Sequence, residues 1–294
     1  MLLEELAMKD SLNIDFHNHW QTGDSFRQKP KTVKEWFKNL LLEEGFSNLT
    51  GALDRIMKTN LDVIYLTNFG DEKRYENWTS EEQLKMAVEA GYEIELGQYY
   101  VFAKKGEKVI AIGKSQEVPT TQGHVLFAGL SRGKRFTSKQ TLDNTLAEAR
   151  DNELKIADHT AARLKGQNGV LAYSKNKEED AEKFDAFEVN GNFSPFSMPF
   201  SPANYLTKLW GRKYEKPVLR NSDGHHPKDI GKTYNIFNSE IIDYSSERKF
   251  RDSINYHARE GNFEYQFKPI PIWRVFHHAL MLGINYLFRK KDNK

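Results

Sequence analysis

Short apolar runs alternate along the chain with longer segments in which apolar residues recur every three or four positions. The short runs are typical of buried strands, and the longer segments are typical of helices with one face on a core. The predicted strands comprise residues 12–16, 61–66, 98–103, 108–112, 124–130, 154–157, 186–189 and 217–220. The predicted helices comprise residues 31–44, 49–57, 80–90, 137–152, 178–183, 202–214 and 247–260.

This alternation predicts parallel βα units, and hence either a barrel or a doubly wound sheet. A chain of 294 residues without an internal repeat or a long linker is expected to form a single α/β domain. The last apolar stretch, residues 272–288, is followed by Arg289, Lys290 and Lys291. We expect a final helix that covers the domain and ends in a solvated basic tail; the alternative is a helix that docks on a membrane surface or a partner.

Composition excludes several kinds of chemistry. The chain has no cysteine, so disulfides, zinc–thiolate sites and cysteine nucleophiles are excluded. Its formal net charge of +2 gives no overall basic field of the kind that favours nucleic-acid binding. The first residues lack the basic and apolar regions of a signal peptide, and no uncharged apolar stretch reaches the roughly 18 residues that span a membrane. A cytoplasmic protein without a transmembrane segment is therefore expected.

Histidines gather at the ends of the predicted strands. The five in such positions are His17, His19, His124, His159 and His225. Because His17 and His19 are two residues apart on an extended chain, their imidazoles point to the same side. Two carboxylates, Glu117 and Asp223, have comparable positions. A set of imidazoles and carboxylates without thiolates suits Zn, Mn or Fe(II), and it is larger than one ion needs. A carboxylate such as Glu117 could bridge two ions.

Five blocks of sequence follow one another in the order of a known pattern. They are Ile14-Asp15-Phe16-His17-Asn18-His19; Ser115-Gln116-Glu117-Val118 with Gly123-His124-Val125-Leu126; Ile156-Ala157-Asp158-His159; Phe187-Glu188-Val189-Asn190; and Asn221-Ser222-Asp223-Gly224-His225 with Asp229-Ile230-Gly231. Together they resemble the PHP (polymerase and histidinol phosphatase) superfamily of metal-dependent phosphoesterases. An HxH motif alone is weak evidence, whereas five blocks in order carry the resemblance over about three quarters of the chain.

The resemblance implies a distorted (β/α)7-type barrel with metal ions at the C-terminal ends of its strands. The ligands of one ion would be His17, His19, Glu117 and Asp223. The ligands of a second ion would be Glu117 again, His124 and His159. A third ion would have Asp24 and His225 among its ligands. The family usually has Thr-Asp-His where this chain has Thr67-Asn68-Phe69, so the third ion is expected to be weak or absent.

The implied activity is hydrolysis of a phosphomonoester or a small phosphodiester, with a metal-bound hydroxide as the nucleophile. Asp223 would hold an ion at the reacting phosphate. Arg163, four residues after His159, would bind phosphate oxygens. His225 would either protonate the leaving oxygen or act only as a metal ligand. The expected partner is therefore a small phosphorylated molecule, and the expected cofactors are two divalent ions.

Three other functions stay open at this stage. A nuclease would need a long basic groove, which the charge balance does not indicate. A degenerate PHP-like domain that binds metal with little catalysis is favoured by Phe69 and opposed by the retained ligands. An amidohydrolase would use a similar ligand set to cleave C–N bonds. In the leading interpretation, residues 12–260 form the metal-dependent hydrolase domain, and residues 261–294 add the apolar helix and basic tail.

Overall fold

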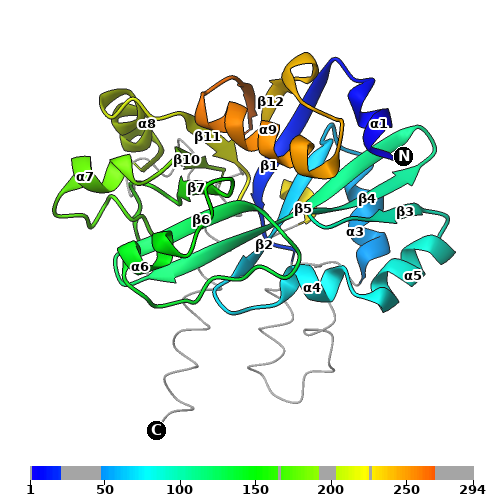
Figure 1. Ribbon diagram of the computed structural model, residues 1–294, viewed down its shortest axis with the longest axis horizontal. Helices are drawn as coiled ribbons and strands as arrows, with labels where there is room; N and C mark the ends of the chain where they lie inside the picture. Colours follow the sequence, from blue (N-terminus) through cyan, green and yellow to red (C-terminus); the bar gives the residue numbers. More distant parts are fainter. Residues whose placement is uncertain (1, 21–47, 165–166, 192–202, 225–226, 269–294) are drawn as a thin grey trace, which may run out of the picture.

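Eleven strands hydrogen-bond into one sheet that curls into a nearly closed barrel, with helices around it, in the computed structural model of this chain (Figure 1). The structure describes residues 2–20, 48–164, 167–191, 203–224 and 227–268. The helices are α1 (Leu2–Ala7), α3 (Leu49–Ile56), α4 (Arg74–Trp78), α5 (Glu81–Glu89), α6 (Leu142–Ala147), α7 (Lys177–Glu182), α8 (Ala203–Lys213), α9 (Glu247–Arg259), and the short 3-10 helices η3 (Pro227–Asp229) and η4 (Ser239–Ile241). The strands are β1 (Ser11–Asn18), β2 (Val63–Phe69), β3 (Glu93–Leu96), β4 (Tyr100–Lys105), β5 (Lys108–Thr120), β6 (Gly123–Leu130), β7 (Leu154–Ala157), β8 (Arg163–Leu164), β9 (Gln167–Asn168), β10 (Ala186–Asn190), β11 (Val218–Asn221), β12 (Thr233–Asn238) and β13 (Glu264–Phe267).

The sheet closes on itself just beyond β11. Its strands lie in the order β11-β10-β7-β6-β5-β2-β1-β12-β13, with β3 and β4 extending it beside the first half of β5. Asn18 of β1 forms a parallel bridge with Gly224. The Asp223 N–H donates to the His17 carbonyl (3.0 Å), and the His19 N–H donates to the Gly224 carbonyl (2.9 Å). The strands from β11 to β1 therefore form the barrel wall, which confirms the predicted distorted (β/α)7-type barrel.

One strand of this wall departs from the predicted parallel arrangement. β6 runs antiparallel to both β5 and β7, whereas the other neighbours in the wall are parallel. A tight turn joins β5 to β6, so the end of one strand lies beside the start of the next. Glu117, near the end of β5, and His124, at the start of β6, are therefore at the same end of the barrel. Gly123 begins β6 with φ 134°, and a Cβ there would lie 2.6 Å from the Val170 Cα, so the turn requires glycine.

A bulge in β1 turns the two histidines of the HxH motif inward. Leu12, Ile14 and Phe16 belong to the apolar cluster inside the barrel. The pairing of β1 with β2 then shifts by one residue between Asp15 and Asn18. An extra residue reverses the alternation of side chains along a strand. The bulge thus lets Phe16 face the apolar interior while His17 and His19 also point into the barrel.

The barrel interior is apolar at one end and polar at the other. The apolar cluster includes side chains of β1, β2, β5, β6 and β7, and it extends to Leu2 and Leu6 of α1 and to Phe250 and Ile254 of α9. A second cluster packs α3 and α5 on the outside, against Ile64 and other residues of β2 and β4. The polar end is formed by the C-terminal ends of the parallel strands, and it contains the buried histidines and carboxylates.

Lys114 of β5 fixes two segments that follow neighbouring strands. The side chain is fully buried, and its Nζ donates to Glu76 Oε1 (2.5 Å) and to the carbonyls of Arg132 (2.8 Å) and Lys134 (2.7 Å). Glu76 also accepts a hydrogen bond from the Asn68 amide (3.0 Å). The unpredicted helix α4 and the segment after β6 are therefore held together by one satisfied buried ammonium group.

Several predicted boundaries can be compared with the structure. The helix predicted over residues 80–90 is present as α5 (Glu81–Glu89), with Ser80 as the N-cap and Ala90 as the C-cap. The helix predicted over 137–152 is shorter, because Thr141 caps α6 and the residues before it hydrogen-bond along β5, as in the bond from the Lys139 N–H to the Pro119 carbonyl. Helix 31–44 and segment 272–288 lie outside the described residues. Within the part of the chain that is described, no helix is long and apolar enough to cross a membrane.

Candidate metal centre

Histidine and carboxylate side chains on or just after β1, β5, β6, β7, β10 and β11 meet at the polar end of the barrel. They form three overlapping groups, and within each group one ligand atom per residue lies within 4.8 Å of the others. The groups are His17, His19 and Asp223; Glu117, His124, Asp158 and His159; and His17, Asp158 and Glu188. All of these residues are buried.

The first group combines the HxH motif with the segment after β11. The Nε2 atoms of His17 and His19 are 2.9 Å apart, so both imidazoles present the same nitrogen to one point. Asp223 Oδ1 lies 3.6 Å from each of these nitrogens. Three ligand atoms that converge from two chain segments are the arrangement that a divalent ion needs.

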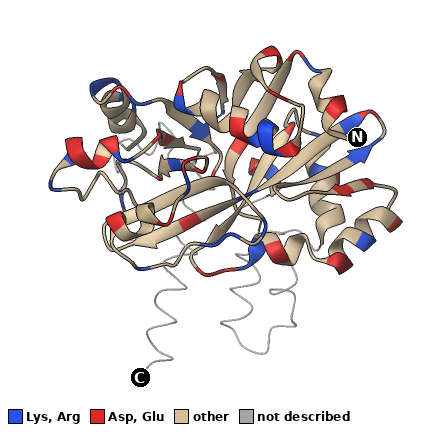
Figure 2. Cartoon of the chain, viewed as in Figure 1, with Lys and Arg blue, Asp and Glu red and all other residues tan. Residues whose placement is uncertain are grey.

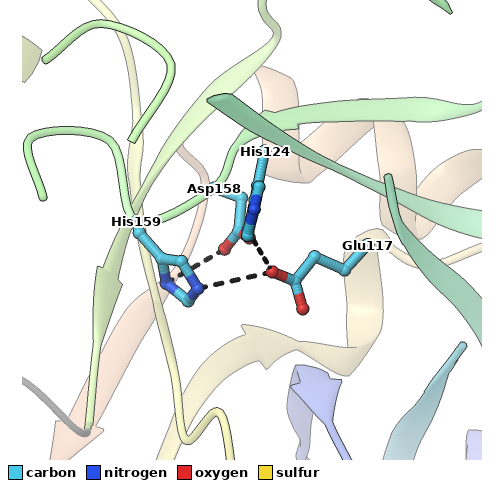
Figure 3. Close-up of side chains that lie close together, drawn as sticks. All are labelled: Glu117, His124, Asp158 and His159. Carbon is cyan, nitrogen blue, oxygen red and sulfur yellow. Dashed lines mark hydrogen bonds and ion pairs between the residues drawn. The ribbon is translucent and has the colours of Figure 1, made fainter. Parts of the chain in front are cut away.

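The second group consists of residues on β5, on β6 and directly after β7, which are neighbouring strands of the barrel wall (Figure 3). Glu117 Oε1 is 2.6 Å from His124 Nδ1 and 3.5 Å from His159 Nε2. Asp158 Oδ1 is 3.2 Å from His159 Nδ1. In Figure 3 the rings of His124 and His159 both face the Glu117 carboxyl group, and Asp158 contacts His159.

Glu117 faces both groups with different oxygens. While Oε1 is directed at His124 and His159, Oε2 is 3.0 Å from His19 Nε2 and 3.6 Å from His17 Nε2. A carboxylate oriented in this way can bind one ion through each oxygen. Glu117 thus lies between the two sets of histidines, and its role as a shared ligand stays a prediction.

Asp158 and Glu188 belong to the cluster, although the sequence patterns did not identify them as ligands. Glu188 lies on the inner face of β10, with Oε1 2.9 Å from His17 Nδ1. Its position alternates with apolar residues of a buried strand, which is a signal that could have identified it. Asp158 directly precedes His159, and regular alternation would place adjacent side chains on opposite faces. His159 has φ 45°, a left-handed conformation that turns both side chains toward the site.

Asp223 is the second candidate ligand with a left-handed backbone, with φ 44°. Non-glycine residues in this region cost about 1–3 kcal/mol and persist only where surrounding contacts fix them. Asp15 supplies such contacts, because its carboxyl group accepts hydrogen bonds from the N–H (3.1 Å) and the hydroxyl (2.5 Å) of Ser222. The Ser222 hydroxyl in turn accepts from the Asn18 amide (2.8 Å) and the Gly224 N–H (3.1 Å). Burial raises the pKa of Asp15 to about 6, although the hydrogen bonds from Ser222 lower it.

Asn190 connects the two groups from the side of β10. Its amide nitrogen lies 2.8 Å from His159 Nδ1 and donates to Asp223 Oδ2 (2.9 Å). Contacts of this kind fix the orientation of metal-binding side chains and are often as important as the ligands themselves.

The cluster concentrates negative charge where water is excluded. Among the described residues, the ion pairs of Glu117, Asp158 and Glu188 are all with histidines, and none is with lysine or arginine. Burial raises the pKa of Asp158 well above its ordinary value. Burial lowers the pKa of His17, but the nearby carboxylates, Glu188 foremost, raise it well above its ordinary value. In the protein alone, protons on histidine therefore supply the positive charge.

The donor set fits divalent metal ions. Both oxygens of Asp158 are buried, and neither accepts a hydrogen bond from the described part of the chain. A buried carboxylate without donors is costly unless a cation neutralises it. Imidazole nitrogen and carboxylate oxygen are the ligands that Zn, Mn and Fe(II) accept. Metal binding at this cluster is therefore chemically consistent, and it would replace protons on the histidines.

This exchange predicts the pH dependence of metal binding. Burial lowers the pKa of His17 and of His159, but the neighbouring carboxylates raise both pKa values well above the ordinary value, so a proton on either ring is held more tightly and must leave before the ring binds metal. The affinity for Zn or Mn should therefore fall as the pH is lowered, by roughly tenfold per pH unit for each proton displaced. Calorimetry in buffers of different ionisation enthalpy measures the protons released. A metal affinity that is constant between pH 6 and 8, without proton release, would contradict this ligand set.

The remaining predicted site residues have varied positions. Asp24 and His225 lie outside the described residues. Arg163 is on β8 with an exposed side chain, and its contact with phosphate stays a prediction. The Asn68 side chain points away from the ligands. Its Oδ1 accepts a hydrogen bond from the Tyr75 N–H (2.7 Å), and its Nδ2 donates to Glu76. Phe69 stands beside the cluster, with its ring centroid 6.4 Å from that of His19 and 5.7 Å from that of His124.

Comparisons with known proteins support the fold. No family model matches the sequence. No curated protein sequence matches it either. The structure is similar to that of PsfC from Pseudomonas syringae PB-5123, with a TM-score of 0.54 and 15% identity over 94% of this chain and 100% of PsfC. It is also similar to a two-domain protein from Bacteroides vulgatus ATCC 8482 that contains a predicted PHP-like metal-dependent phosphoesterase, with a TM-score of 0.50 and 14% identity. That match covers 87% of this chain and 65% of the other. The chain thus shares its fold with these two proteins and has a buried histidine–carboxylate cluster.

Proposed function

We propose that this protein is a metal-dependent phosphoesterase that hydrolyses a phosphomonoester or a small phosphodiester. The observation that carries the proposal is the orientation of Glu117, whose two oxygens face two different histidine groups. The likeness in fold to a protein with a predicted PHP-like phosphoesterase agrees with it. Two divalent cations held by these side chains would neutralise phosphate oxygens and lower the pKa of water as the nucleophile.

Each side chain of the cluster has a distinct role in this proposal. His17, His19 and Asp223 hold one ion, and Glu117 is shared between the two. His124, Asp158 and His159 hold the second ion, with Asp158 added to the ligands that the sequence indicated. Glu188 orients His17 through the 2.9 Å contact with Nδ1. Three further residues complete the proposal. His225 is a proton donor or a metal ligand, Asp24 is a ligand of a weak third ion, and Arg163 binds the phosphate.

Surface charge favours a small substrate over a long nucleic acid. Lys and Arg are interspersed with Asp and Glu over the described chain, and the formal net charge is +2 (Figure 2). Long nucleic acids bind to extended basic surfaces that neutralise several phosphates. A phosphomonoester or small diester needs only the ions and a few side chains.

Hydrolysis of aryl phosphates by purified protein tests the proposal. p-Nitrophenyl phosphate and bis-p-nitrophenyl phosphate are offered to protein stripped with a chelator and then reloaded with Mn or Zn. Turnover that requires the reloaded metal is the expected result. Metal binding without turnover of either ester would favour the degenerate domain, which Phe69 beside the ligands also favours. The matched control is stripped protein in a buffer that contains magnesium in place of Mn or Zn. It detects effects of added metal that do not depend on reloading with Mn or Zn.

A further inference from the structure

Phe69 is an apolar side chain at the edge of an otherwise polar cluster. It ends β2 and is aligned with Glu117 in the parallel pairing of β2 with β5. Aligned residues of neighbouring strands have side chains on the same face of a sheet, so the Phe69 ring is on the inner face with Glu117. The ring packs edge-on against His19 of the first group and His124 of the second.

Phe69 is the more accessible residue of this arrangement. His19, Glu117 and His124 are buried, whereas Phe69 is partly exposed. A molecule that reaches the ligands from the polar end of the barrel therefore meets the ring beside them. Phosphate oxygens require cations, so an apolar ring contributes little to binding the phosphate itself.

Hydrogen bonds hold the backbone that directly follows Phe69. The N–H of the next residue, Gly70, donates to the Glu117 carbonyl (2.8 Å), and the Gly70 carbonyl accepts from the Gln116 side chain (2.8 Å). Arg135 donates to the carbonyls of Asp71 (2.6 Å) and Glu72 (2.8 Å). A ring on a backbone fixed in this way is preorganised, and a contact with it costs little ordering.

We propose that Phe69 selects substrates by contacting the organic group of the phosphoester, and that it favours an aryl or other apolar group over a hydroxylated one. This inference rests on the proposed phosphoesterase activity and names the substrate class of the same site. A sugar or polyol group against the ring would gain no hydrogen bond from it for its hydroxyls. An apolar group would gain from burial against the ring.

Substrate pairs measured on Phe69→Ala test this selection. The ratio of kcat/KM for phenyl phosphate to that for glycerol phosphate is compared between wild type and variant, because the intrinsic reactivities of the two esters cancel in the comparison. We expect the ratio to fall about tenfold in Phe69→Ala and less in Phe69→Leu. Tyr265→Ala, which removes a half-exposed aromatic ring on β13, is the control and should leave the ratio unchanged. An unchanged ratio in Phe69→Ala would overturn the inference.

Binding of phosphonates separates this inference from the proposed activity. Phenylphosphonate and methylphosphonate are titrated into Mn-loaded protein, which requires no hydrolysis. Tighter binding of phenylphosphonate in the wild type, lost in Phe69→Ala, supports the role of the ring even if no ester is hydrolysed. Equal affinities of the two phosphonates in both proteins, or absence of binding by either, overturns it. If esters are hydrolysed and Phe69→Ala does not change the preference between them, the proposed phosphoesterase activity stands and the proposed selection by Phe69 is wrong.

Discussion

Replacing Glu117 by Gln should reduce metal-dependent phosphoester hydrolysis by at least about a hundredfold. The substitution keeps the shape of the side chain but removes its negative charge. One oxygen becomes an amide nitrogen, which cannot bind an ion. The side chain can then no longer bind one ion beside His124 and another beside His19. The loss should appear in kcat and persist at saturating substrate, and the bound metal should fall toward one ion per chain.

A matched control separates this effect from the general cost of altering a buried carboxylate. Glu153 is also buried, and its carboxyl group accepts a hydrogen bond from the Arg150 N–H (2.9 Å) away from the cluster. Glu153→Gln should retain both the metal content and the activity of the wild type. Activity in Glu117→Gln equal to that of Glu153→Gln would exclude Glu117 as the shared ligand.

Ser222→Ala should weaken one ion selectively, by about tenfold to a hundredfold in affinity. The hydroxyl donates to Asp15 and accepts from Asn18 and Gly224, and these bonds surround the left-handed backbone of Asp223. Without them Asp223 is expected to relax away from His17. Stepwise titration with Co(II), monitored by absorption, resolves the two binding events. The step that involves Asp223 should move to higher metal concentration while the other remains.

The control for Ser222→Ala is another buried serine. Ser239 on η4 bonds to the Tyr244 hydroxyl, on a segment outside the cluster, so Ser239→Ala tests the loss of a buried hydroxyl alone. Its metal titration should match the wild type. Activity of Ser222→Ala should recover at saturating metal, because the ligands themselves are intact. Failure to recover, with both steps equally weakened, would mean that Ser222 supports the whole barrel end and not Asp223 in particular.

The local, repeated signals of the sequence predicted an α/β domain, either a barrel or a doubly wound sheet, and the resemblance to the PHP superfamily implied the barrel. Apolar runs ending in His17, His159 or Asp223 indicated strand ends at one side of a sheet, and the structure places all three there. The direction of β6 was not predictable from periodicity, because alternation is the same in parallel and antiparallel strands. Only the short turn at Gly123 shows that β6 is antiparallel to β5. That turn lies between two segments that were predicted separately, so their pairing was not predicted.

The sequence did not identify Asp158 as a residue of the cluster, because its position depends on backbone geometry beyond regular strands. Asp158 reaches the cluster because His159 is left-handed, and no pattern of residue types specifies that conformation. The inward position of His17 beside inward Phe16 likewise depends on the bulge in β1. Glu188 could have been identified from the sequence, because it alternates with apolar residues in a buried strand. Asp24 and His225 remain predictions.

Metal content tests the central claim most directly. Purified protein is stripped, reloaded with Zn or Mn, dialysed against metal-free buffer and analysed by elemental mass spectrometry. The arrangement of Glu117 between two histidine groups predicts two ions per chain that are retained on dialysis. Protein that retains no ion after reloading, at a pH where the histidines are neutral, would contradict the metal centre and the phosphoesterase together.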